Sequence, residues 1–325
     1  MTMTNHDLAV SGPRTSRQDR EQRGRAARAT APRALLAHWH PAPGRPDPVD
    51  LIEGDESTRD PALVPLRHER MAVSAFTFFR GTARIMARDL ASLGNSTLET
   101  QLCGDAHLSN FGLFASEDRR VVFDVNDFDE TFPGPFEWDL KRLATSFVLA
   151  GFDAGLRPEI GHAAALEAAR TYRTAMSDYA SMPIMRVWYD RMESSQVEAI
   201  ISSSTGKVGK RAVRHGVAKA RSRNSWSVIR KLTREVDGRR EFADRPPLLT
   251  RIPLDGPTAG FVNETFEGYR ESLTAARRNL LDRFRIVDFA HKVVGVGSVG
   301  LYSWVVLLEG GDPDDLLVLQ IKQAQ

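Results

Sequence analysis

The segment from Cys103 to Asn110, Cys-Gly-Asp-Ala-His-Leu-Ser-Asn, constrains this chain more than any other. It places Asp105 and Asn110 five residues apart, and the acid-rich stretch Val121–Asp129 follows closely. Phosphoryl transfer from a nucleotide uses such a set: one carboxylate accepts a hydroxyl proton, while an amide oxygen and a second carboxylate hold magnesium ions. We therefore expect a fold that brings a polar loop and the end of an acidic strand into one pocket.

A second motif lies near the other end of the sequence. The glycine-rich stretch Val294–Gly300 precedes the strand-like run Leu301–Leu308, and another apolar run ends at Lys322. A dinucleotide-binding turn would be followed by a helix, so the strand-like run favours a hairpin lid over phosphates. The candidate phosphate-binding residues are Gly295, Gly297, Gly300 and Lys322.

The composition is that of a soluble globular protein: of 325 residues, 42% are apolar and 26% are charged. The net charge of +2 argues against a general polyanion binder. A single cysteine excludes an internal disulfide framework and fits a reducing compartment. No apolar run approaches the roughly 20 residues that cross a bilayer. Since the N-terminus also lacks the apolar segment of a signal peptide, we expect a cytoplasmic protein that does not contact a membrane.

The chain divides into four regions. Residues 1–60 form a basic arm and a proline-rich linker, and we interpret the arm as a mobile tail in preference to a nucleic-acid arm or an organelle presequence. Residues 61–150 hold the catalytic-loop and metal-site motifs. Residues 151–285 have a helical pattern with a basic stretch, and residues 286–325 are β-rich and contain the glycine hairpin and its lysine.

Within these regions, periodicity and turn residues predict individual elements. The predicted helices are Gly81–Leu93, Phe136–Leu149, a long helical stretch from Leu166 to about Leu232, and Thr265–Arg283. The predicted strands are Leu98–Leu102 and a hairpin made of Phe111–Phe114 and Val121–Val125.

The basic stretch from Lys207 to Arg240 is open to three interpretations. A nucleic-acid surface usually interleaves stacking aromatic residues, and here Trp226 stands alone, so nucleic acid is not favoured as a partner. A solvated helical face is favoured, and the edge of a pocket for an anionic substrate is the alternative. Its basic residues include Lys207, Lys210, Arg211, Arg214, Lys219, Arg221, Arg223, Arg230, Lys231 and Arg234.

Asp105 is the candidate catalytic base, because a carboxylate oriented by its loop can take the proton of an incoming hydroxyl. His107 belongs to the same catalytic loop, where it could bind a metal, act as a base, or hold the loop through a hydrogen bond to the backbone. The third role is favoured, since magnesium prefers oxygen ligands to imidazole. The alternative for the whole motif is a polar turn that Asn110 caps.

Asn110, Asp127 and Asp129 are the candidate metal ligands. Strand alternation places Asp127 and Asp129 on one face and Phe128 on the other. Two neighbouring acids repel each other unless a cation relieves them, which favours a metal over an acidic surface turn. Asp127 is preferred to Asp129. Asp139, near a helix start, is interpreted as structural, with its carboxylate accepting backbone N–H groups of the catalytic loop.

These motifs resemble known families. Gly104–Asn110 resembles the catalytic loop of aminoglycoside and choline-type phosphotransferases, in which Gly-Asp is followed by a histidine and an asparagine. The sequence resembles more closely the bacterial family called domain of unknown function 2252, which is grouped with protein-kinase-like folds. That likeness runs from about Arg33 to the C-terminus and rests on the catalytic loop together with Arg70–Gly81, Phe123–Thr131 and Phe136–Arg142.

The resemblance implies an α+β fold that is protein-kinase-like but circularly permuted. A mostly helical large lobe would come first, and an incomplete β-rich small lobe would follow the catalytic loop. The cofactors would be ATP and Mg²⁺. Carried over by motif, Asp105 would be the base, Asn110 and Asp127 the magnesium ligands, and Lys322 the lysine that pairs with phosphate.

The sequence departs from the family pattern at three points. Cys103 replaces a histidine or tyrosine, which we expect to weaken the anchoring of the loop. The hairpin before Asp127 is longer than usual, so Asp124 is a rival ligand. The chain stops three residues after Lys322, before any helix that could supply a glutamate partner, and we expect a truncated product.

The function expected from these features is ATP- and magnesium-dependent phosphorylation of a hydroxyl-bearing or anionic acceptor. Two other functions stay open. One is a nucleotide-binding protein of the same fold without turnover. The other is a metal-dependent hydrolase built on Asp105, His107 and Asp127.

Overall fold

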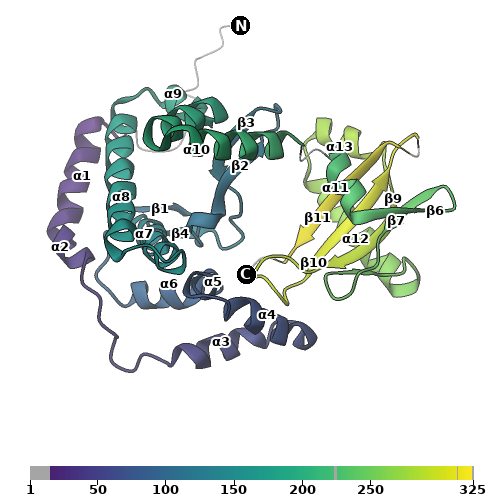
Figure 1. The fold of residues 1–325 in the computed structure, drawn as a ribbon, viewed down its shortest axis with the longest axis horizontal. Helices are drawn as coiled ribbons and strands as arrows, with labels where there is room; N and C mark the ends of the chain where they lie inside the picture. Colours follow the sequence, from purple (N-terminus) through teal and green to yellow (C-terminus); the bar gives the residue numbers. More distant parts are fainter. Residues whose placement is uncertain (1–14, 223–224, 313, 324–325) are drawn as a thin grey trace, which may run out of the picture.

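The computed structural model describes residues 15–222, 225–312 and 314–323, without the side chains of 204–210, 212–213, 219–222 and 225–228. Two lobes are visible in Figure 1: a helical lobe (residues 15–222) and a sheet lobe (residues 225–323). Helices and strands both contribute, as the expected α+β class requires. Among the described helices, none combines the length and apolar character needed to cross a bilayer.

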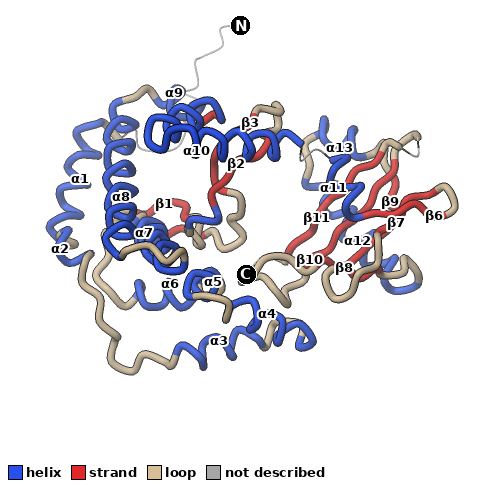
Figure 2. Tube along the Cα trace, in the orientation of Figure 1, coloured by secondary structure: helices blue, strands red, loops and turns tan. Residues whose placement is uncertain are grey.

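The helical lobe begins with a series of helices, the first of which run along its outer edge (Figure 2). They are α1 (Arg17–Thr30), α2 (Arg33–Leu36), α3 (Pro48–Glu56), the 3-10 turn η1 (Pro61–Leu63), α4 (Val64–Met71), α5 (Ala75–Arg80) and α6 (Ala83–Ala91). Helix α6 confirms the prediction for Gly81–Leu93, with ends two residues inside those expected.

The interpretation of the basic arm as a mobile tail is wrong for its described part, because Arg17–Thr30 forms α1. Alanine and arginine are strong helix formers, and Ser16 and Asp19 close a capping box at the N-terminus. The side chains of Ala27 and Ala31 are buried. The helix therefore packs with small residues, which a search for large apolar residues overlooks.

The catalytic loop lies between two short strand pairs that precede a long helix. The elements are β1 (Glu99–Leu102), the 3-10 turn η2 (Leu108–Asn110), β2 (Phe111–Ala115), β3 (Val121–Val125), β4 (Phe132–Pro135) and α7 (Glu137–Asp153). Strand β1 pairs antiparallel with β4, and β2 pairs antiparallel with β3. The predicted strand, hairpin and helix in this part of the sequence are confirmed.

The chain then crosses to the second lobe through α8 (Pro158–Ser181), α9 (Ile184–Tyr189), β5 (Met192–Glu193), α10 (Ser194–Ser222) and α11 (Ser225–Leu232). Part of the basic stretch lies outside the described residues: the whole of Arg223, and the side chains of Lys207, Lys210, Lys219 and Arg221. The described basic residues are exposed, as a solvated face predicts: Arg211, Arg214, Arg230, Lys231 and Arg234.

The sheet lobe holds β6 (Thr233–Val236), β7 (Arg239–Phe242), β8 (Leu249–Arg251), α12 (Gly256–Ser272), α13 (Ala275–Leu281), β9 (Arg285–Lys292), β10 (Ser303–Glu309) and β11 (Leu316–Lys322). Its main sheet is antiparallel, in the order β11-β10-β9-β8. Within the region 151–285, the predicted helical stretch ends near Leu232, as α11 does, but the strands between Thr233 and Arg251 were not predicted. Those strands are short and rich in charge, so they lack a clear apolar alternation.

Alternate residues of β10 divide the sheet between two apolar cores. Val305 and Leu307 face a core that includes Ile229 of α11 and Phe242 of β7. Val306 and Leu308 face the opposite core, which includes residues of α12 and α13. A strand that is buried on both faces shows a continuous apolar run in the sequence, and this explains the run before Lys322 as well.

Candidate active site

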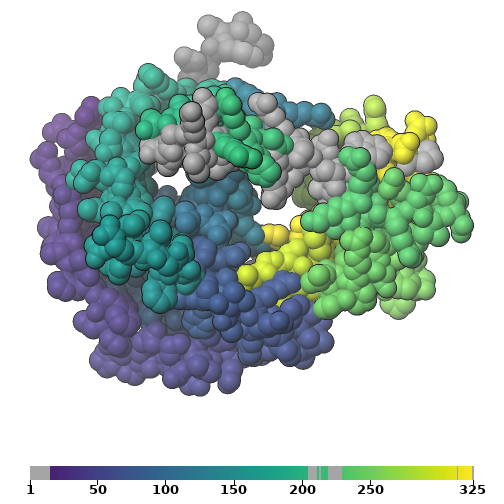
Figure 3. Space-filling view, in the orientation of Figure 1, coloured from purple at the N-terminus to yellow at the C-terminus, as the bar shows by residue number. Residues whose placement is uncertain are grey.

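A cavity of about 240 Å³ lies between the two lobes and is lined by both candidate motifs. In Figure 3 the surface is hollowed there, and yellow atoms of the C-terminal segment lie beside blue atoms of the N-terminal helices. Its wall includes Arg80, Asp105, His107, Asn110, Asp127, Asp129 and Glu130 from the helical lobe, and residues 294–298, Tyr302 and Lys322 from the sheet lobe. Segments far apart in sequence thus meet in one crevice.

Asp139 of α7 anchors the start of the catalytic loop. Its carboxylate accepts hydrogen bonds from the backbone N–H of Cys103 at 2.6 Å and of Gly104 at 3.1 Å, which confirms the structural role predicted for it. The loop is thus anchored through the backbone N–H of Cys103, although the change of side chain at this position was expected to weaken the anchoring. Gly104 has φ +84°, and a Cβ there would lie 1.9 Å from the carbonyl oxygen of Glu130, so only glycine fits.

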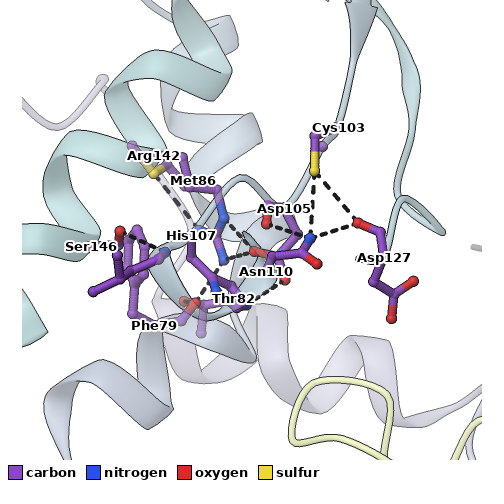
Figure 4. A network of polar contacts seen from close by, with 12 residues as sticks. Phe79, Thr82, Met86, Cys103, Asp105, His107, Asn110, Asp127, Arg142 and Ser146 are labelled. Atoms are coloured by element: carbon purple, nitrogen blue, oxygen red, sulfur yellow. Dashed lines mark hydrogen bonds and ion pairs between the residues drawn. The ribbon is translucent and has the colours of Figure 1, made fainter. Parts of the chain in front are cut away.

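Asp105 is buried at the cavity wall and held by Arg142 of α7 (Figure 4). Arg142 donates to Oδ1 from Nε at 2.6 Å, and its Nη2 donates to the carbonyl oxygen of Phe79 at 2.8 Å. Burial alone would raise the pKa of Asp105, but the hydrogen bond from His107 and the charge of Arg142 outweigh it, and the pKa lies below its ordinary value. Asp105 is therefore ionised at neutral pH.

His107 lies beside Asp105, with Nε2 at 3.4 Å from the second carboxylate oxygen. Its backbone N–H donates to the carbonyl oxygen of Asp105 and its own carbonyl accepts from Asn110, both at 2.8 Å, which closes the loop. The ring packs edge-on against Phe76. The buried Nδ1 has no hydrogen-bond partner among the described residues. The main chain of His107 holds the loop, and the role of its ring stays a prediction.

The candidate metal ligands converge at the far side of the loop. The amide nitrogen of Asn110 donates to the carbonyl oxygens of Asp127 at 2.6 Å and Asp105 at 3.1 Å, so its oxygen is the atom left for a cation. Lys322 Nζ donates to Asp127 at 2.8 Å and to Asp129 at 2.9 Å. Asp124 is exposed, does not line the cavity, and accepts from the N–H of Val125, which disfavours it as a ligand.

These donors fit magnesium in kind, because all three offer oxygen. Within the described residues, no group of three or more His, Cys, Asp or Glu side chains could hold a metal, so Asn110 would have to complete the set. The Lys322 ammonium now sits between the two carboxylates. A divalent cation bound by Asp127 and Asp129 would therefore require Lys322 to turn toward another anion.

The glycine motif forms the loop between β9 and β10, and Lys322 of β11 is paired directly with Ser303 at the start of β10. The loop carbonyls have donors: Gly295 accepts from Arg70, and Gly297 and Val299 accept from Arg59. In contrast, the backbone N–H groups of residues 295–298 donate to no described residue. Free N–H groups above a cavity suit an anion.

Gly300 differs from the other two glycines, because it is not part of the cavity wall. Its φ of +88° turns the chain, and a Cβ there would lie 3.0 Å from the Cβ of Arg59. Gly295, with φ +71°, and Gly297 do line the cavity. The structure thus assigns Gly300 to packing against Arg59, away from the predicted phosphate position.

Glu130 and Arg142 are site residues that the sequence analysis missed. Glu130 lines the cavity, where burial, followed by the charges of Asp105, Asp127 and Asp129, raises its pKa to about 7. Glu130 directly follows the predicted metal ligand Asp129, and this position in the sequence could have identified it as a site residue. Arg142 ends the motif Phe136–Arg142, but that motif alone does not indicate its contact with Asp105, which depends on where α7 packs.

Neither the curated proteins nor the solved structures include one that matches this chain. The model of a family described as an uncharacterized protein conserved in bacteria, DUF2252, matches residues 59–325. The match covers the sheet lobe, the helical lobe from residue 59 onward, and every residue of the cavity wall named above. The chain belongs to the DUF2252 family.

Proposed function

We propose that this protein binds ATP with magnesium and transfers the terminal phosphoryl group to a hydroxyl-bearing or anionic acceptor, as a permuted kinase-like enzyme in the cytoplasm. One observation carries the proposal: the cavity brings Asp105, Asn110 and Asp127 together with the glycine loop and Lys322. A simple hydrolase needs the acids but not a glycine loop with free N–H groups.

Different residues of the cavity wall would bind the phosphates of ATP and the magnesium ion. The N–H groups of residues 295–298 would donate to phosphate oxygens, and Lys322 would leave Asp127 and Asp129 to pair with phosphate. Asn110 and Asp127, with Asp129, would hold magnesium, which supplies positive charge against the phosphates. Both changes would occur together, because the cation replaces the charge that Lys322 removes.

Asp105 would orient the acceptor hydroxyl and take its proton. Its lowered pKa makes it a weak base, yet phosphoryl transfer with a loose transition state depends more on positioning than on base strength. Arg142 holds Oδ1 in place, which leaves Oδ2, on the side of His107, for the acceptor. Geometry of this kind is what a positioned base needs.

A nucleotide-binding protein without turnover is the second candidate. The observation that favours it is the same contact with Arg142, because an acid engaged by a buried guanidinium is less available to a substrate. ATP binding would be common to both candidates, so turnover has to separate them.

The proposal is tested in two steps. Thermal unfolding of the wild-type protein is measured with ATP, with and without magnesium, and we expect the larger rise in melting temperature with both. ATP consumption is then compared for wild type, Asp105→Ala and the matched control Asp124→Ala, an exposed acid outside the cavity. We expect a loss of about 10²–10⁴-fold for Asp105→Ala alone. Equal rates for wild type and Asp105→Ala would refute the catalytic assignment and leave the binding protein.

A further inference from the structure

Arg80 is a cation without a partner on the cavity wall. It ends α5 and lines the cavity beside the glycine loop. No described residue accepts a hydrogen bond or forms an ion pair with its guanidinium, and its Nε is sealed from solvent. A charged donor that is shielded from water and unpaired is costly, so such a group calls for an explanation.

The neighbouring arginines differ from Arg80 in their other contacts: the Nε atoms of Arg59 and Arg67 are also buried and unpaired, but their terminal nitrogens have partners. Arg59 and Arg70 donate to carbonyl oxygens of the glycine loop, and Arg142 donates to Asp105 and to Phe79. Each holds one segment against another. Arg80 holds nothing through its side chain, although it lies among them and faces the same cavity.

The surroundings of Arg80 define what it could bind. Its backbone carbonyl is in close contact with Gly297, where an added Cβ would lie 2.8 Å from that oxygen. The unpaired N–H groups of residues 295–298 therefore belong to the same part of the wall. Two acids that also line the cavity, Asp127 and Asp129, both pair with Lys322, whose single charge offsets one of the two carboxylates. Arg80 and the loop N–H groups are thus neighbouring donors on the cavity wall, and neither forms an ion pair or hydrogen bond with a described residue.

We propose that Arg80 and the N–H groups of residues 295–298 form a subsite for a phosphate group. A guanidinium offers parallel donors that match two phosphate oxygens, and the loop N–H groups would contact the others. The phosphate could be the terminal one of ATP or one carried by another ligand. The first source rests on the proposed function, whereas the subsite itself requires only an oxyanion of phosphate type.

The test measures affinities for ATP, ADP and inorganic phosphate by calorimetry in wild type, Arg80→Met, Arg80→Lys and Arg84→Met. Arg84 is the matched control, because it is highly exposed, pairs with Asp55 and is not part of this cavity wall. We expect Arg80→Met to weaken ATP binding by about tenfold or more and Arg80→Lys by less, with ADP little changed if the terminal phosphate is the occupant. Arg84→Met should match wild type.

Unliganded stability separates a binding role from a structural one. Since the Arg80 side chain has no partner, Arg80→Met should melt at or above the wild-type temperature while it binds phosphate more weakly. If wild type binds no nucleotide but binds phosphate in an Arg80-dependent way, the subsite stands and the proposed function fails. If ATP, ADP and phosphate bind equally well to Arg80→Met and wild type, or if wild type binds none of them, the subsite is refuted.

Discussion

The cavity wall and the sheet lobe are built on different physical principles. Around the cavity, buried polar side chains contact one another across long sequence distances, as Asp105 does with Arg142 and Asp139 does with the loop N–H groups. In the sheet lobe, most buried side chains are apolar, and the most deeply buried run is formed by consecutive residues of β10, Val305–Leu308.

The difference matters for how each region responds to change. When an apolar side chain of a core is truncated, the free energy of unfolding falls with the amount of buried apolar contact that is removed. A second substitution at a neighbouring position does not restore it. A buried ion pair behaves otherwise, because removing one partner leaves a charge without compensation, while removing both is much less harmful. The two regions can therefore be separated by paired substitutions.

The largest effect is expected from Arg142→Met. The variant leaves Asp105 buried without its cation, which should lower the free energy of unfolding by about 3–5 kcal/mol. Met is apolar and suits the contacts with Phe79 and Met86. Urea unfolding provides the measurement. The double variant Arg142→Met/Asp105→Asn should regain most of the loss, and a double variant as unstable as the single one would show that the charge is not the cause.

Leu307→Ala should follow closely. Leu307 is fully buried in β10, and truncation of such a side chain lowers the free energy of unfolding by about 2–5 kcal/mol. The matched control is Leu280→Ala on α13, where the same atoms are exposed and little loss is expected. Here no second substitution should restore stability in the way expected for the ion pair. Equal effects at the two leucines would contradict the assignment of the core.

A smaller, pH-dependent effect is expected at Glu130. Its pKa is raised from 4.5 to about 7 in the folded state, so the folded protein keeps a proton that the unfolded chain has released. The free energy of unfolding should therefore fall as pH rises through this interval. Glu130→Gln carries no charge and should remove that part of the fall. The fall is measured by urea unfolding of wild type and Glu130→Gln between pH 4.5 and about 7, with a metal chelator present. Identical pH profiles for the two proteins would show that Glu130 is not the titrating group.

The smallest effect is expected from Phe128→Ala. In the sequence Phe128 stands between the two acids that contact Lys322, and its ring is 62% exposed, so its loss should change the free energy of unfolding by less than about 0.5 kcal/mol. The result sharpens the comparison, since an aromatic residue near the cavity would matter less than a leucine in the sheet. A loss above about 1 kcal/mol would indicate an apolar contact that supports the acidic loop.

Much of the fold follows from local patterns in the sequence. The hairpin β2–β3 and helix α7 were predictable because apolar runs and turn residues set them without help from distant segments. The strands between Thr233 and Arg251 were not, because charged residues alternate there and β8 is stabilised by pairing with β9. Helix α1 was missed because its buried side chains are alanines.

The candidate site could be predicted only in part. The loop residues Asp105 and Asn110, and the glycine motif with Lys322, were identified because each occurs in a compact motif, and the structure brings them to one cavity. Arg80 and Arg142 lie in the segments Arg70–Gly81 and Phe136–Arg142, which carry the family resemblance, but neither segment by itself indicates a role for its arginine. Their importance depends on where α5 and α7 pack, which is a property of the tertiary structure and not of the local sequence.

The way the glycine loop is held would limit how a ligand of the proposed phosphate subsite enters and leaves the cavity. Arg59 and Arg70 come from the N-terminal part of the chain, yet they grip the loop at Gly295, Gly297 and Val299. The loop cannot move outward together with β9 and β10 unless its hydrogen bonds with Arg59 and Arg70 break. Ligands would have to enter and leave along the side of the crevice, or the outer helices would have to travel together with the loop.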